Sequence, residues 1–302
     1  MNEKFLDIET GESYITFETE SNALLSGESI TFWGWYPPLP NLNWPRLSLE
    51  LVDSDGEIMF GTINPHPARN QPLRAGKAYY LYADFDGAQL RFIGILTDSR
   101  DGNIYQTVTI DNQVWMAENL KYLPNVVTPT IISDTDPYYY VYDYYGNDVV
   151  EAKIEENYTT YGVLYNWPAA MAGSTSSNAN PSAVQGICPA GWHLPSEAEW
   201  AQLIDYLGGE YVAGGKLKEI GLMNWEDPNE GATNEAGFKA LPGGYNGWGG
   251  YFEELGTQGY WWSATDNSSE FSWSSKMNYD DDGVSVQGNY KQFAYSVRCV
   301  KD

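Results

Sequence analysis

The sequence is short of cysteine, histidine and basic residues, and each shortage excludes a class of function. It has two cysteines and two histidines, whose spacings do not suit a zinc site. Sixteen Lys and Arg residues stand against 41 Asp and Glu residues, so the formal net charge is −25. A field of this sign repels phosphate backbones and anionic lipid, so nucleic acid is not an expected partner. No run approaches the roughly 20 apolar residues of a membrane helix, so no transmembrane segment is expected.

Aromatic residues and glycine are abundant, and they indicate a turn-rich β protein. The chain has 24 Tyr, 12 Trp and 30 Gly among 302 residues, a length that favours two domains. The turn-rich segment Thr97–Asn103 marks the expected boundary, giving domains at 1–98 and 99–302. Alternating or apolar runs with turns between them predict an all-β sandwich in the first domain, with strands over 13–20, 29–36, 46–52, 57–60, 78–85 and 89–96.

The stretch Gly186–Trp200 predicts the start of the main helix. Ser196 and Glu199 have the spacing of a capping box, in which each side chain satisfies a backbone N–H. Apolar residues then follow at the spacing of one helical face: Trp200, Leu203, Ile204 and Leu207. The glycine pair at 208–209 can enter the left-handed region and end the helix.

Strands are expected on both sides of this helix. Residues 101–120 read as two strands around an Asp111-Asn112 turn, 121–185 is loop-like, and 160–171 can hold a strand leading into a helical turn. Further strands are expected at 237–241, 259–265, 270–279, 284–287 and 294–300. The last strand is expected to place Tyr295, Val297 and Cys299 on one face. Residues 242–252 contain too much glycine for regular structure.

Five blocks occur in order along the second region: DGNIYQTVTIDNQVWMAENLKY, YGVLYNWPAAM, CPAGWHLPSEAEW, GYWWSAT and YSVRCVKD. They resemble the Fibrobacter succinogenes major paralogous domain, a family of Bacteroidetes surface proteins, over about residues 100 to 302. The third block is also similar to formylglycine-generating enzymes. Both families are similar to C-type lectins, so the resemblance implies an α+β C-type-lectin-like domain. The first region is similar to fimbrillin-like modules.

The resemblance places cysteines at the positions of Cys188 and Cys299, which implies a disulfide between the helix entry and the last strand. Two buried free thiols are the alternative. Because disulfides persist outside the cytosol, the bond implies export to the cell surface or outer membrane. The N-terminus shows no signal peptide core, which by itself indicates a cytosolic protein. The disulfide favours export instead, with the leader missing from this chain.

The ligand face is expected on the glycine- and aromatic-rich loop. Tyr245, Trp248 and Tyr251 suit glycan or protein recognition, because they present large rigid surfaces at low entropic cost. The lectin resemblance extends the face to Asp266 and Phe271. Burial in the core is the competing interpretation for each ring, and at least one of Trp261 and Trp262 is expected there. The calcium motifs Glu-Pro-Asn and Gln-Pro-Asp of sugar-binding C-type lectins do not occur in the sequence.

Two further constellations have ordinary structural interpretations. The run Asp280, Asp281, Asp282 before Gly283 offers oxygen ligands for calcium, but a hairpin turn is the more common use of Asp-Gly. A Ser-His-Asp triad would need His66 or His193, and His193 lies in a Gly-Trp-His-Leu-Pro turn that it is expected to hold.

These observations predict a cell-surface adhesion or ligand-binding protein, in the manner of a fimbrial tip subunit. Its expected partners are a host or bacterial surface glycan or protein, and other fimbrial subunits. The first domain would serve as a stalk. The alternatives are a cell-envelope enzyme, related to formylglycine-generating enzymes or a glycosidase, and a purely structural envelope protein.

Overall fold

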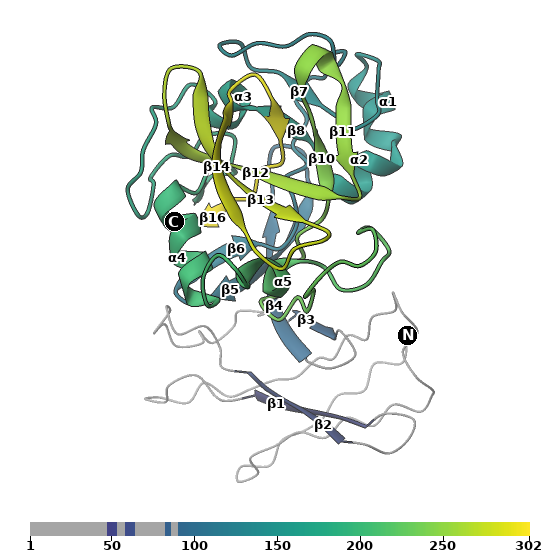
Figure 1. Cartoon of the computed structure of the whole chain (residues 1–302). Helices are drawn as coiled ribbons and strands as arrows, with labels where there is room; N and C mark the ends of the chain where they lie inside the picture. The colour runs from purple at the N-terminus through teal and green to yellow at the C-terminus, as the bar shows by residue number, and fades with distance from the viewer. Residues whose placement is uncertain (1–46, 53–57, 64–81, 86–89) are drawn as a thin grey trace. The chain divides into compact units, whose positions relative to one another are not determined.

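The computed structural model (Figure 1) describes residues 47–52, 58–63, 82–85 and 90–302, and the chain divides into two compact units, Met1–Ile93 and Gly94–Asp302. In the first unit, β1 (Leu47–Val52) pairs antiparallel with β2 (Ile58–Ile63). The hairpin expected at 78–96 is confirmed, because β3 (Tyr82–Phe85) pairs antiparallel with the first half of β4 (Leu90–Thr97). The strands expected at 13–20 and 29–36, and His66, lie outside the described residues.

One sheet of the second unit joins the start of the unit to its end. Residues 94–97 of β4 pair with β5 (Ile104–Ile110), which forms a hairpin with β6 (Gln113–Met116) across the predicted Asp111 turn. The short strand β16 (Val300–Lys301) then pairs with both β6 and β9 (Trp192–His193). The last residues of the chain therefore lie between segments from the beginning and the middle of the unit.

The second sheet carries the rest of the strands (Figure 1). Its order is β14 (Ser285–Tyr290), β13 (Phe271–Asn278), β12 (Gln258–Asp266), β10 (Gly243–Asn246), β15 (Ala294–Tyr295), β8 (Leu164–Asn166) and β7 (Tyr139–Tyr140), with β11 (Phe252–Leu255) paired to β10. The strands predicted at 259–265 and 270–279 and the hairpin across residues 280–283 are confirmed.

The helices are few and mostly short. They are α1 (Val149–Ile154), α2 (Glu156–Tyr161), α3 (Trp167–Met171), α4 (Glu197–Tyr206) and α5 (Ala213–Leu217). The second unit is thus rich in β-structure, and the region 121–185, expected to be loop-like, holds three of these helices. None of the helices in the described part of the chain has the length and apolarity needed to cross a membrane.

Helix α4 begins and ends as predicted. The Ser196 hydroxyl accepts a hydrogen bond from the Glu199 N–H, and the Glu199 carboxylate accepts one from the Ser196 N–H, which completes the capping box. Gly208 and Gly209 adopt φ values of 105° and 98° at its end. The four predicted apolar residues are buried; Trp200, for example, packs against Trp115, Phe238 and Trp261.

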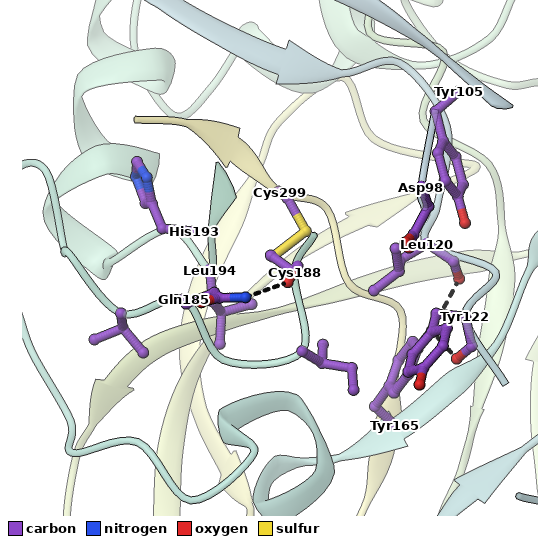
Figure 2. Close-up of a disulfide and its surroundings, with 12 residues drawn as sticks. Asp98, Tyr105, Leu120, Tyr122, Tyr165, Gln185, Cys188, His193, Leu194 and Cys299 are labelled. Carbon is purple, nitrogen blue, oxygen red and sulfur yellow. Dashed lines mark hydrogen bonds between the residues drawn. A yellow bond between two sulfur atoms is a disulfide. The ribbon is translucent and has the colours of Figure 1, made fainter. Parts of the chain in front are cut away.

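The predicted disulfide joins Cys188 to Cys299 (Figure 2), so the alternative of two free thiols is wrong. Both cysteines are fully buried, and the Gln185 side chain donates to the carbonyl of Cys188. The bond ties the segment before α4 to the segment before β16, inside the same core that contains Tyr165 and Leu194.

The strand expected at 294–300 is interrupted. β15 lies in one sheet and β16 in the other, because the residues between them cross from sheet to sheet. The carbonyls of these residues accept hydrogen bonds from the end of β6 and the residues after it: Met116 N donates to Cys299 O, and Leu120 N donates to Val297 O. All three residues expected on one face, Tyr295, Val297 and Cys299, are buried in one core.

Two expectations for the glycine-rich region are wrong. Residues 243–246 form β10, whose Gly244 has φ of 59° and lies where a Cβ would come within 2.3 Å of the Glu253 carbonyl oxygen. Glycine here permits the close pairing of β10 with β11 and does not prevent a strand. Residues 237–241 do not form the expected strand; they make a single bridge, in which Ala240 exchanges backbone hydrogen bonds with Leu217 and Glu219 on either side of Lys218.

Candidate functional site

Five rings from three segments form a connected cluster that we call the aromatic platform: Tyr245, Trp248, Phe271, Tyr290 and Phe293. Trp248 is exposed, Tyr245, Phe271 and Tyr290 are partly buried, and Phe293 is buried. Its neighbouring centroids lie 4.3 Å apart for Phe271 and Tyr290, and 4.8 Å apart for Tyr290 and Trp248. Phe293 lies 5.3 Å from Trp248 and 5.9 Å from Tyr245. The platform therefore runs from the start of β13, across the end of β14, to the hairpin of β10 and β11.

Trp248 is the most exposed ring of the platform and is also held firmly. Its side chain is 57% exposed. Tyr290 meets it at an interplanar angle of 65° and Phe293 at 90°, both edge-to-face arrangements favoured by the ring quadrupoles. A partner that covers the indole would therefore find it already ordered, with little further side-chain entropy to lose.

The turn that presents Trp248 depends on two glycines. Gly249 and Gly250 have φ values of 71° and 76°, which L side chains rarely adopt. A Cβ on Gly250 would lie 2.2 Å from the carbonyl oxygen of Pro129, and a Cβ on Gly249 would lie 2.9 Å from the Tyr251 ring. The glycines thus let the turn pack on Pro129 and let Tyr251, which is 70% exposed, lie across it.

Beneath the platform, the rings continue into the core. Tyr245 contacts Tyr260 edge-to-face at 5.2 Å, Tyr260 stacks on Tyr295 at 4.7 Å, and Tyr295 lies 4.5 Å from Trp262. The Tyr245 hydroxyl donates to the Glu253 carboxylate at 2.8 Å. Burial, and then the Glu253 charge, raises the pKa of Tyr245, so the phenol stays a donor. Through these contacts, the rings of the platform are connected to rings that are buried in the core.

The structure brings together some of the predicted ligand-binding residues and separates others. Tyr245, Trp248 and Phe271 belong to the platform. Asp266 lies at the exposed end of β12, where its carboxylate accepts a hydrogen bond from the Ser176 hydroxyl at 2.7 Å and so holds the loop after α3. Trp261 and Trp262 are both fully buried, as the core interpretation proposed for at least one of them.

Tyr290 and Phe293 connect the platform, and the sequence interpretation missed them. The strand expected at 284–287 extends to Tyr290. Continuing the alternation of Val284 and Val286 through Gly288 reaches Tyr290, so the signal was present but was interrupted by glycine. Phe293 follows in a turn, where no periodicity identifies it.

The acidic run 280–282 forms the turn between β13 and β14, as its hairpin interpretation proposed. The Gly283 N–H donates to the Asp281 carboxylate at 2.7 Å, which is the local bond of an Asx turn. Lys218 brings its ammonium to the carbonyl oxygens of Asn278 and Asp281, both at 2.8 Å. Within the described residues no group of three His, Cys, Asp or Glu side chains gathers to hold a metal ion, so the calcium interpretation gains no support.

His193 lies between two carboxylates at the entry to α4. Its Nε2 is 2.7 Å from the Glu199 carboxylate and its Nδ1 is 2.8 Å from the Asp302 carboxylate. Burial lowers the pKa of His193, but the hydrogen bonds and charges of Glu199 and Asp302 outweigh it and raise that pKa above the usual value. Both ring nitrogens are engaged, so the histidine joins the helix start to the end of the chain and has no nitrogen left to activate a nucleophile.

Comparisons with known proteins agree with the block resemblance. The family model of the Fibrobacter succinogenes major domain matches residues 108–301, which covers most of the second unit. Neither the curated proteins nor the solved structures give a match. The matched segment contains α4 with its capping box, both cysteines and the whole aromatic platform. The chain therefore belongs to the Fibrobacter succinogenes major domain family.

Proposed function

We propose that the chain is an exported, surface-attached protein that binds a ligand through the aromatic platform, in the manner of an adhesin or fimbrial tip subunit. In this proposal the second unit has a C-type-lectin-like fold. The first unit is a β-sandwich that serves as a stalk or docking module. The ligand is a glycan or a protein on another surface.

The exposed but fixed indole of Trp248 carries the proposal. Exposed apolar side chains that lie together often mark interaction sites, and rigid Trp and Tyr side chains dominate the energetics of many interfaces. Here the indole is braced by Tyr290 and Phe293, and in the turn beneath it Gly250 packs on Pro129. A purely structural protein would be expected to bury this ring.

Export is supported by the disulfide. Cys188 and Cys299 are both fully buried, and structural disulfides of this kind form and persist in oxidising compartments. The enzyme alternative has less support. Since the sequence has two cysteines and both are in the disulfide, no thiol remains for chemistry of the formylglycine-generating type.

Binding to glycan and surface-protein arrays tests the proposal. Trp248→Ala should lower the apparent affinity by about tenfold or more, as truncation of a central aromatic anchor does. Tyr211→Ala is the matched control, because Tyr211 is 81% exposed but lies between α4 and α5, outside the platform. Equal binding by wild type and Trp248→Ala would remove the platform as the binding surface. Unchanged melting temperatures of both variants confirm that folding is intact.

A further inference from the structure

We propose that the platform, taken as the binding surface of the proposed function, accepts an arginine- and lysine-containing segment of a partner protein. Two features carry the inference. Carboxylates flank the rings at both ends, and the lysines of the neighbouring strands are engaged with carbonyls or rings. The occupant is chosen by charge and hydrogen-bonding complementarity, and a neutral glycan is the competing ligand.

The first carboxylates lie at the Tyr245 end of the platform. Glu253 is paired with Tyr245 across the β10–β11 hairpin and accepts its hydroxyl, and Glu254 follows it. Both are exposed. Their field reaches the rings: after burial, the charges of Glu254 and Glu253 raise the pKa of Tyr260, and Glu253 also raises that of Tyr245.

The other carboxylates lie at the Phe271 end. Glu270 directly precedes Phe271, and its carbonyl accepts a hydrogen bond from the N–H of Lys291, the residue after Tyr290. Asp266 ends β12 across from Ser272. Glu270 is exposed, and Asp266 is exposed but bonded to the Ser176 hydroxyl, so acidic residues stand at both ends of the row of rings.

The two lysines close to the platform offset only part of this charge. Lys291 is 7% exposed; its ammonium donates to the Ser268 carbonyl at 2.8 Å and lies 4.5 Å from the centre of the Trp167 ring. Lys276 lies 5.6 Å from the centre of the Tyr260 ring. The four exposed carboxylates therefore outnumber these two ammonium groups, on a chain whose formal net charge is −25.

Arginine fits both parts of this surface. Ionised carboxylates only accept hydrogen bonds, whereas the guanidinium only donates them and is always charged. The planar guanidinium also stacks on an indole, where the ring quadrupole attracts the cation. A neutral glycan would use the rings but would gain nothing from the charge of the acids, and an anionic glycan would be repelled. The surface thus favours a basic polypeptide segment.

Binding of a labelled Gly-Ser peptide carrying several arginines, measured by fluorescence polarisation on the full chain, tests the inference. The matched probe replaces each arginine by citrulline, which keeps the planar group and removes the charge. We expect the arginine peptide to bind about tenfold more tightly. Its affinity should fall as ionic strength rises from about 0.01 M to about 0.15 M, because the Debye length shortens from about 30 Å to about 8 Å.

The variants separate this inference from the proposed function. Glu253→Gln with Glu270→Gln should weaken the arginine peptide by roughly three- to tenfold and the citrulline peptide by much less, whereas Asp205→Asn on α4 should change neither. Equal binding of the two peptides, no binding of the arginine peptide, or no effect of the double variant would overturn the inference. In each of those cases, Trp248-dependent binding on the glycan or surface-protein arrays would leave the proposed function standing, and its absence on both arrays would remove both proposals.

Discussion

Breaking the disulfide between Cys188 and Cys299 is expected to remove a large part of the stability of the second unit. The bond has a sequence separation of 111 residues. In the chain-entropy description, closing a loop of this length restricts the unfolded chain by about 4.8 kcal/mol at 25 °C. Because domains are stable by about 5–15 kcal/mol, reduction should leave the unit near its unfolding threshold. The melting temperature should fall by roughly 10–20 °C for a unit of this size.

Urea unfolding followed by tryptophan fluorescence measures this loss in two independent ways. Reduction of the wild-type chain breaks the bond without changing packing, whereas Cys188→Ala with Cys299→Ala also removes two buried sulfur atoms. The double variant should therefore lose about 1–2 kcal/mol more than the reduced wild type. Each single variant should cost nearly as much as the double variant, because either substitution alone breaks the bond.

Two results would refute this reasoning. A reduced wild-type chain that kept its free energy of unfolding to within about 1 kcal/mol would show that loop closure does not stabilise the unit. Strict additivity of the two single variants would show that the cysteines act independently, each through its own packing.

Three further predictions concern other sites. Because burial lowers the pKa of His193 but its two carboxylate partners raise it more, its stabilising contribution should be complete below about pH 6.5 and lost as pH rises through the raised value. The free energy of unfolding of His193→Gln should not show that decline with pH. Parallel pH profiles for the wild type and the variant would contradict the prediction. Arg298 is fully buried and donates to Asn119 and to three backbone carbonyls, so Arg298→Lys should cost about 2–4 kcal/mol in urea unfolding, with a cost near zero refuting the network. Gly250→Ala should lower the melting temperature more than Gly173→Ala, because both have positive φ but only the first would meet backbone atoms within 4 Å. Equal decreases in melting temperature would show that the cost comes from the positive φ alone and not from contact with Pro129.

The sequence predicts best those features whose signals are local. The capping box at Ser196 depends on two side chains three residues apart, and the helix face behind it on a fixed period, so α4 is found with its correct ends. Hairpins with Asp-containing turns are found for the same reason. The cysteine pairing needed the family resemblance, because two cysteines far apart carry no local signal of their partner.

Features that depend on distant contacts are not predicted. β15 and β16 are separate strands because the carbonyls of Val297 and Cys299 accept hydrogen bonds from the N–H groups of Leu120 and Met116. No residue near Val297 in the sequence indicates these distant partners. The partners of His193 are also not predicted from the sequence. Glu199 is recognised there only as part of the capping box, and its hydrogen bond to His193, like that of Asp302, is seen only in the folded chain. In the platform, the sequence identifies Trp248 as a candidate contact residue because it lies in a glycine- and aromatic-rich loop. Its contact with Phe293 is seen only in the folded chain.

The crossing of residues 296–299 between the two sheets has a consequence for how the protein is made. Arg298 bonds to Asn119 and to Met116, residues that are synthesised almost two hundred positions earlier. Neither sheet of the second unit is complete until this final segment leaves the ribosome, since β15 and β16 are interior strands of each. The second unit therefore has a late folding step that cannot begin during most of its synthesis. In a chain with this order of assembly, both sheets close only after residues 294–301 have been synthesised.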